Sequence, residues 1–374
     1  MPDPRLYATR GSLKGKNSML PYYLLIGVPM LLSLASYSDD RRVVNKKFPL
    51  LVFFLLFILL LSLRSVNCGV DLLTYRRKFN HPGTVSFWSL FDFAITEPGF
   101  LLLTAVCKKT VNSFQFYLFL CALLSLVPIM VLYLKESSHN LLTIALFLGI
   151  APFSMFFSGL RQSIAMGIGA VCYYCCREKK PFSFLLLVFL AYLFHQSSLI
   201  LLLMYPLLHL KITKKWIPLV VAVVAGCFVF RDQIFGYALQ FSDKYERRYV
   251  ISETGSYTFF ILLLLLTVYS FAMLKDSEFE AFDLRNILVF TLILQSFALS
   301  NTVAMRLNYY YLIFIPLLIP KVIDCARTEL RQVARVSSAV FVCFFVFWFF
   351  KEAYSGADIL HVFPYVPFWR NLWW

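Results

Sequence analysis

Long apolar runs separated by short polar segments fill most of the chain. A helix needs about 20 apolar residues to cross a bilayer, and roughly ten runs are long enough. The pattern therefore predicts an all-α polytopic membrane protein with about ten transmembrane helices. We place these helices over residues 19–37, 48–65, 112–134, 139–157, 160–176, 216–231, 257–274, 285–301, 305–323 and 335–351.

Two further apolar segments do not have the length of a simple span. The stretch 98–107 is about half a span, and this length predicts a short re-entrant or interfacial helix. The stretch 181–208 is long, and the polar segment 195–198 interrupts it near its middle. It is either one tilted helix or a broken helical hairpin, and this choice decides the sidedness of every later segment.

The composition agrees with a membrane protein. Of the 374 residues 60% are hydrophobic and only 15% are charged, and the mean hydropathy is +0.73, so the chain has too little polar surface to enclose a soluble core. The net charge of +15 comes from short Lys and Arg clusters between apolar runs. Such clusters are typical of topology signals beside a lipid bilayer, and we expect no nucleic acid as a partner.

The distribution of Lys and Arg also predicts a topology. If 181–208 returns to its own side, the basic loops share the cytoplasmic side, where positive loops accumulate. The opposite face then receives the polar stretches 66–97, 232–256 and 352–374. The basic N-terminal residues conflict with this arrangement, because they would lie outside. The six loops expected to lie together are 38–47, 135–138, 177–180, 211–215, 275–284 and 324–334.

We divide the chain into three parts. Residues 1–18 form an N-terminal extension that we expect to be disordered, residues 19–351 form one polytopic membrane domain, and residues 352–374 form an outer-face tail. No internal repeat divides the membrane domain further.

Several classes of chemistry have no motif in this sequence. Eight of the nine cysteines lie within or beside apolar runs, so we expect no disulfide framework and no metal site. The chain also lacks a nucleotide-phosphate loop, a metalloprotease helix and a serine-nucleophile elbow. We expect no cofactor, and the remaining chemistry is that of arginines, acids and a histidine.

The first candidate residues follow the second span. Arg64, a glycine turn, Asp71 and Tyr75 are suited to holding a phosphate and a sugar hydroxyl, although an arginine at the membrane edge paired with Asp71 has the same pattern. Glu97 precedes the short helix 98–107. Its carboxylate either caps that helix or reaches a buried substrate.

Further candidates lie at the heads or in the middle of apolar runs. Arg161-Gln162 offers a guanidinium fork and a carboxamide for a diphosphate or a sugar, although an arginine that extends to the interface is the alternative. His195 lies halfway along 181–208 and is either catalytic or a structural hydrogen-bonding group. Arg306 precedes Tyr309, within a set of tyrosines that also fits an interfacial belt.

These polar positions together resemble the EpsG-type family of bacterial Wzy polysaccharide polymerases. Their order and approximate spacing match, and the Arg-Gln and His-Gln-Ser elements are the most specific parts. The N-terminal extension departs from the usual early start of the first span. The residues that carry the resemblance are Arg64, Asp71, Tyr75, Glu97-Pro98-Gly99-Phe100, Gly159-Leu160-Arg161-Gln162-Ser163-Ile164-Ala165, Phe194-His195-Gln196-Ser197-Ser198 and Arg306-Leu307-Asn308-Tyr309.

The resemblance implies a glycosyltransferase with a C-type (GT-C) membrane fold in the bacterial inner membrane. Its active site would face the periplasm or the outer side, and it would polymerise O-antigen or exopolysaccharide repeat units without a metal. The donor would be the growing glycan on undecaprenyl diphosphate, and the acceptor a new lipid-linked repeat unit. A chain-length regulator protein is a further implied partner.

The resemblance also implies roles for the candidate residues. Arg161 and Arg306, with Arg64, would clamp diphosphate, and Gln162, Tyr75 and Tyr309 would contact substrate. Asp71, Glu97 and His195 are the candidates for the base, and the sequence does not rank them. Two other functions share this chemistry, namely an O-antigen ligase and a lipid-linked oligosaccharide flippase or transporter.

Overall fold

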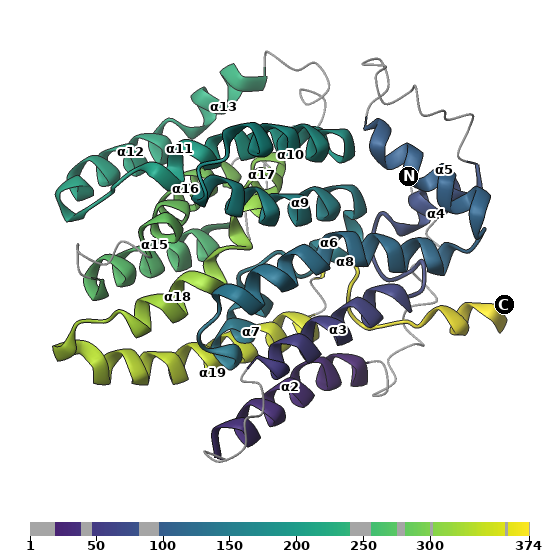
Figure 1. Cartoon of the computed structure of the whole chain (residues 1–374), viewed down its shortest axis with the longest axis horizontal. Coiled ribbons are helices and arrows are strands. Elements are labelled where there is room, and N and C mark those ends of the chain that lie inside the picture. Colours follow the sequence, from purple (N-terminus) through teal and green to yellow (C-terminus); the bar gives the residue numbers. More distant parts are fainter. Residues whose placement is uncertain are drawn as a thin grey trace.

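The computed structural model describes residues 19–38, 47–81, 97–239, 256–274, 281–299, 302–355 and 358–373. The predicted disordered extension 1–18 lies outside these ranges. Every regular element within them is a helix, as predicted. Most of the longer helices run roughly alongside one another, and their connections gather at the two ends of the bundle (Figure 1).

Most of the predicted spans correspond to helices with similar bounds. By length and apolar composition, α6 and the helix formed by η7 and α19 are able to cross a bilayer alone, and the bent pair α17–α18 is a third candidate. The number of about ten spans therefore stays a prediction. The matching helices are α2 (Leu20–Ser38), α3 (Phe48–Ser62), α6 (Phe114–Glu136), α9 (Leu160–Arg177), α12 (Ile217–Val229), α15 (Ser256–Met273), α16 (Phe282–Ala298) and α19 (Arg331–Ser355), the last preceded by η7 (Thr328–Leu330).

Two predicted spans are broken, so their prediction as continuous helices is wrong. Residues 139–157 form α7 (Asn140–Gly149) and the single turn α8 (Met155–Ser158), with Pro152 between them. Residues 305–323 form α17 (Thr302–Leu312) and α18 (Ile315–Asp324), which meet at an angle of 42°. A proline at each break lacks the N–H that would continue the helical hydrogen bonds, and its ring clashes with the preceding turn.

The segment 181–208 is a broken helical hairpin, which decides between the two predicted forms. Helix α10 (Pro181–Phe194) ends at His195, whose backbone is extended, and η4 (Gln196–Leu203) and α11 (Met204–His209) follow. The ring of Phe184 lies 5.4 Å from that of Tyr205, so the two arms pack side by side. Phe184 lies near the start of α10 and Tyr205 lies in α11, near the end of the segment, so the hairpin returns to its starting end.

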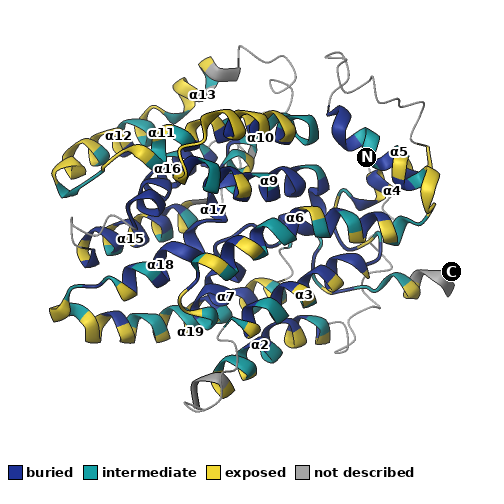
Figure 2. Ribbon diagram, viewed as in Figure 1, coloured by how far each residue is buried: buried dark blue, intermediate teal, exposed yellow. Residues whose placement is uncertain are grey.

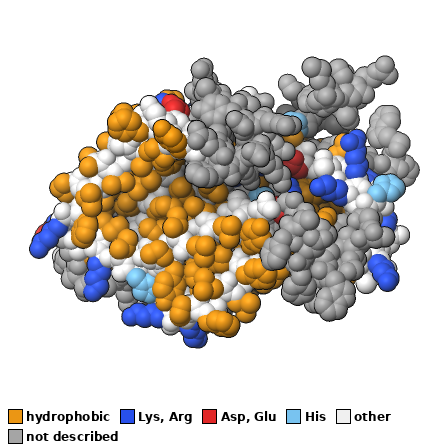
Figure 3. Space-filling view, turned by 90° about the horizontal axis from the view of Figure 1, so that it is seen from above, with side chains coloured by type: hydrophobic (Ala, Val, Ile, Leu, Met, Phe, Trp, Pro, Cys, Tyr) orange, Lys and Arg blue, Asp and Glu red, His pale blue; other side chains and the backbone are white. Residues whose placement is uncertain are grey.

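The lipid-facing surface is formed by helices at the edge of the bundle. Apolar side chains of α10, α12 and α19 are exposed, while α16 and α18 are mostly buried (Figure 2). The face seen in Figure 3 is largely apolar, with Lys and Arg side chains towards its ends. Soluble proteins rarely expose so large an apolar patch, and the protein is therefore membrane-embedded.

Polar contacts join the predicted cytoplasmic loops at one end of the bundle. Glu136 accepts hydrogen bonds from Arg177 (2.9 Å) and Lys321 (2.5 Å), and Arg177 also lies 3.5 Å from Asp283. Lys47 donates to the backbone of Leu134 and Lys135, Arg285 donates to Ile212, and Leu274 pairs with Ala326. The described parts of all six loops thus lie together, as the topology prediction requires.

The C-terminal tail packs against the loop that follows α3, at the opposite end of the bundle. Ser65 N–H donates to Val366 (2.7 Å) and Gly69 N–H donates to His361 (2.9 Å). Ser158 Oγ donates to the backbone of Leu360 (3.1 Å), which ties the tail to α8 as well. The remaining elements are α4 (Leu72–Asn80), α5 (Pro98–Thr110), η5 (Lys214–Trp216), α13 (Arg231–Leu239) and η8 (Phe368–Trp373).

Candidate active site

Glu97, Arg161 and His195 meet in one buried cluster. Glu97 Oε2 accepts a hydrogen bond from Arg161 Nη1, and Glu97 Oε1 forms a hydrogen bond with His195 Nδ1. The Glu97 side chain is 6% exposed, that of His195 16% and that of Arg161 34%. One carboxylate therefore holds both an arginine and a histidine, and the arginine is the most accessible of the three.

The ends of two short helices produce this contact. Helix α5 starts at Pro98, and its Gly99 lies so close to the end of α10 that an added Cβ would be 3.0 Å from Leu193 Cβ. Glu97 has the left-handed conformation (φ 61°), which is uncommon for a residue other than glycine. It makes no capping hydrogen bond, so its interpretation as a simple helix cap is wrong.

Tyr75 extends the cluster from α4. Arg161 Nε donates to the Tyr75 hydroxyl (3.3 Å), and the guanidinium carbon lies 6.0 Å from the centre of the tyrosine ring. Asp71, one turn earlier at the start of α4, is partly buried and has no side-chain hydrogen bond to Glu97, Arg161 or His195. The structure thus brings Tyr75 to the arginine and leaves Asp71 beside the cluster.

Gln162 and Arg306 form a second contact next to the cluster. Gln162 is buried, and its amide nitrogen donates to the backbone oxygen of Arg306 (2.5 Å). The Arg306 residue itself is exposed, and Tyr309 lies one turn further along α17. Arg161 and Arg306 are therefore linked through Gln162, with at least part of each arginine open to a ligand.

Arg64 lies in a different environment. It is 1% exposed, donates to the backbone oxygen of Leu61 and lies 5.5 Å from the centre of the Phe157 ring. The C-terminal tail crosses beside it, where Arg64 forms an isolated bridge with Pro367. Arg64 and Asp71 form no ion pair with each other, so the predicted Arg-Asp pair at the membrane edge is wrong.

Comparison with known proteins places these residues in a family. The sequence profile of the EpsG family matches residues 47–366, which includes every residue of the cluster. The chain belongs to the EpsG family. No curated protein and no solved structure matches the chain.

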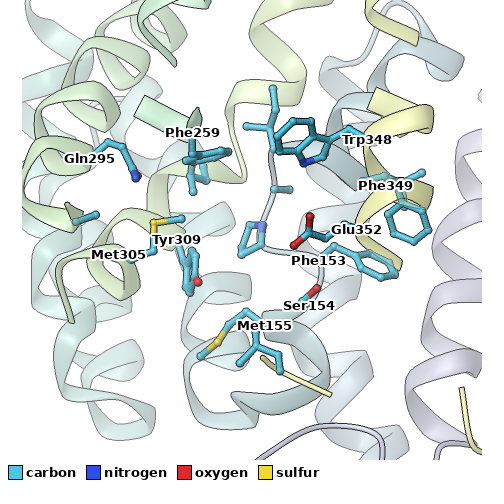
Figure 4. Close-up of a pocket in the computed structure, with 18 of the residues that line it drawn as sticks. Phe153, Ser154, Met155, Phe259, Gln295, Met305, Tyr309, Trp348, Phe349 and Glu352 are labelled. Carbon is cyan, nitrogen blue, oxygen red and sulfur yellow. The ribbon is translucent and has the colours of Figure 1, made fainter. Parts of the chain in front are cut away.

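This EpsG-family chain also contains a cavity that the sequence did not reveal. Its volume is about 370 Å³, and it lies between α8, α16, α17 and α19, with Tyr309 on its wall (Figure 4). Gln295, Trp348 and Glu352 reach it from the other helices. Gln295 lies inside a predicted span and Glu352 lies directly after the last predicted span. Both are polar residues beside apolar runs, as Gln162 is, but neither belongs to a short motif that would have indicated a site.

The cluster has few metal-ligating groups. Within the described ranges, no three His, Cys, Asp or Glu side chains are grouped in a way that would hold a metal ion. What the EpsG-family cluster does offer is a carboxylate that orients an imidazole through Nδ1, beside a guanidinium that binds anions. This combination is suited to moving a proton next to a phosphate.

Proposed function

We propose that this protein is a metal-independent glycosyltransferase that polymerises O-antigen or exopolysaccharide repeat units. The observation that carries the proposal is the contact of Glu97 with both Arg161 and His195 in a membrane-embedded bundle. Membership of the EpsG family supports a polysaccharide polymerase. Buried ionisable groups in a membrane protein are costly, and they mark sites of function.

The donor in this proposal is the growing glycan on undecaprenyl diphosphate. Arg161 and Arg306 bind the diphosphate, because two guanidinium groups neutralise the negative charge that grows as it leaves. A hydroxyl of the lipid-linked acceptor attacks the anomeric carbon of the donor sugar. The new C–O bond forms as the bond from that carbon to the phosphate oxygen breaks, and the hydroxyl proton passes to a base.

His195 is the base that the geometry favours among the three candidates. Glu97 forms a hydrogen bond with His195 Nδ1, which holds the imidazole ring in one orientation. Both carboxylate oxygens of Glu97 are already hydrogen-bonded, one to His195 and one to Arg161. The hydrogen bonds among Glu97, Arg161, His195 and Tyr75 do not include Asp71. We therefore assign Glu97 as a positioning residue. Tyr75 supports Arg161, and Gln162 fixes α17 at Arg306.

The proposal places the protein in the bacterial inner membrane, with about ten spans and a GT-C fold. The end of the bundle that joins the six basic loops lies in the cytoplasm, because positively charged loops are retained there. The opposite end, with α4, α5 and the C-terminal tail, then faces the periplasm or the outer side (Figure 1). Since α5 lies at that end, the lipid-linked glycans reach the cluster from outside.

The test is polymerisation by purified protein in liposomes supplied with the lipid-linked repeat unit alone. A ladder of polymer lengths is expected. A ligase would instead need a different acceptor, and a flippase would move the lipid across the bilayer without lengthening the glycan. A wild-type protein that translocates the lipid and produces no ladder would contradict the proposal.

Arg161→Lys is the informative variant in this assay. Lysine keeps the charge but lacks the fork that holds Glu97, Tyr75 and a diphosphate together, so a loss of about 10²-fold in rate is expected. Arg177→Lys is the matched control, because Arg177 ends the same helix at the other end of the bundle. Equal rates for the two variants would exclude Arg161 from the reaction.

A further inference from the structure

The cavity described above contains a buried amide with an unused donor. Gln295 is completely buried, and its Oε1 accepts a hydrogen bond from Asn308 Nδ2 (3.0 Å). This bond fixes the orientation of the amide, and Gln295 Nε2 then has no hydrogen-bond partner among the described residues. The amide nitrogen points into the cavity in Figure 4. A buried donor without a partner is rare in proteins, and it indicates a ligand or water at that position.

Other groups around the same space have complementary chemistry. Glu352 and Trp348 lie one turn apart on α19, and the Glu352 carboxylate faces the cavity with the Tyr309 side chain across from it (Figure 4). The cavity volume of about 370 Å³ is within the range of small-molecule sites, roughly 300–1,000 Å³. The walls thus combine an aromatic ring, an acceptor, a donor and a hydroxyl.

From this geometry we infer that the cavity is a glycan subsite that holds sugar residues of the lipid-linked repeat unit. Sugars present alternating hydroxyl donors and acceptors around an apolar face. Gln295 donates to a ring or acyl oxygen, Glu352 accepts from hydroxyls, and Trp348 packs against the apolar face. The carboxylate favours neutral or amino sugars over acidic ones, because it repels a second carboxylate.

The subsite adjoins the candidate active site, and in this respect the inference rests on the proposed function. Met155 of α8 lines the cavity, and it packs so closely on Gly159 that an added Cβ there would be 2.0 Å from Met155 Cε. Gly159 is two residues from Arg161. On α17, Tyr309 lines the cavity, while Tyr310 reaches the hairpin through Ser197 (hydroxyl oxygens 3.1 Å apart). Through α8 and α17, the cavity therefore contacts the two segments that carry Arg161 and His195.

The first test is binding of a soluble probe to the full-length protein in detergent. The probe is the oligosaccharide released from the lipid-linked repeat unit of the producing cell, and calorimetry gives its Kd. Trp348→Ala and Glu352→Gln are each expected to weaken binding about fivefold or more. Phe347→Ala is the matched control, because Phe347 precedes Trp348 on α19 and is 66% exposed. Unchanged binding by both cavity variants would overturn the inference.

The second test separates this inference from the proposed function. In the liposome assay, Gln295→Leu and Glu352→Gln are expected to raise the apparent KM for the lipid-linked repeat unit about fivefold with a much smaller change in kcat. Wild-type KM values for both variants would overturn the subsite. If the wild-type protein forms no ladder but binds the soluble glycan, and the cavity variants lose that binding, the polymerase proposal fails and the glycan subsite stands.

Discussion

At the scale of single residues, Glu97 connects the groups that the chemistry needs. A glutamate in the left-handed conformation directly before a proline is strained, and such strain persists only where surrounding contacts hold it. Here the contacts are the two hydrogen bonds of its carboxylate to Arg161 and His195. The same side chain therefore fixes the start of α5 against α9 and the hairpin tip, and it orients the proposed base.

Glu97→Gln is expected to lower the polymerisation rate about 10²-fold or more, because the amide neither orients His195 nor balances Arg161. The measurement is the initial rate of ladder formation. In the His195→Ala background the same change should cost little further, since residues that act as a unit are not additive. Glu329→Gln, an exposed acid in η7 at the other end of the bundle, is the control. Independent, multiplying losses would show that Glu97 does not act through His195.

Gly69 is the one described glycine whose backbone has a positive φ, at 120°. An added Cβ would lie 2.2 Å from the backbone oxygen of Phe157, so the two segments approach too closely for any side chain. Gly69 N–H also binds the C-terminal tail at His361. The glycine turn predicted beside Arg64 is therefore confirmed, and its role is to let α8 and the tail pack against the loop.

Gly69→Ala is expected to destabilise the protein by more than about 1 kcal/mol, through both the strained φ and the contact with Phe157. Thermal unfolding in detergent measures this loss. Gly27→Ala is the matched control, because Gly27 lies inside α2 and an added Cβ meets nothing within 4 Å. That control should be neutral or slightly stabilising. A Gly69→Ala protein as stable as the wild type would contradict the close approach.

At the scale of elements, contacts at the ends of helices determine how the helices of this fold are arranged. The two broken spans have a proline at each break, and the α10–α11 hairpin has His195 at its tip. Polar contacts between helix ends then fix how the elements pack. One such contact joins the start of α7 to the end of α18, where His139 Nε2 lies 2.6 Å from Asp324 Oδ1.

The His139–Asp324 contact should make stability depend on pH. The hydrogen bond with Asp324 raises the pKa of His139 above its usual 6.5, although partial burial opposes the shift. A raised pKa in the folded state means that the stabilisation is fully present below about pH 6.5 and is lost as the pH rises through the folded value. Both side chains are more than 40% exposed, so the effect should stay below about 1 kcal/mol.

The measurement is the difference in Tm between the wild type and Asp324→Asn at pH 5.5 and at pH 8.5. The difference should be larger at pH 5.5. Burial alone would raise the pKa of Asp324, but the hydrogen bonds from His139 and Ser138 lower it overall, so the acid is still charged at pH 5.5. Glu329→Gln should show no such dependence. A difference that is the same at both pH values would mean that His139 does not titrate against Asp324.

At the scale of the whole molecule, the hairpin decides the topology. Because 181–208 returns to its own end, the basic loops before and after it lie together. If 181–208 instead crossed the membrane once, every later helix would run in the opposite direction across the bilayer. The polar cluster then lies where the short α5 meets the hairpin tip. Gly99 near the start of α5 and Leu193 near the end of α10 are in close contact, so the two helix ends meet inside the bundle.

Cysteine labelling tests this topology. The background for labelling is Cys343→Ser, because Cys343 is the one exposed native cysteine. In this background, Lys179→Cys and Lys211→Cys should react with a membrane-impermeant maleimide only in inverted vesicles. Asp232→Cys should react only in spheroplasts, because the predicted span that contains α12 lies between positions 211 and 232. Labelling of positions 179 and 211 from opposite sides would mean that 181–208 crosses the membrane once.

Much of the fold follows from the sequence alone. The number of apolar runs, the short helix after Glu97, the polar break at His195 and the positive loops are local properties, and local periodicity and composition determine them. Polar residues at the start of apolar runs, such as Arg161 and Gln162, could also be identified from local composition. A polar residue within hydrocarbon is conspicuous wherever it occurs.

Only the tertiary structure decided which of these residues meet. Glu97 is 64 positions from Arg161 and 98 from His195, and no local pattern reports a contact across such separations. Packing also buried Arg64 beside the C-terminal tail, which folds back over its loop. It left Gln295 with an unused donor at a cavity wall. Sequence periodicity determines which face of a helix is apolar, whereas the contacts between remote helices depend on how the whole bundle packs.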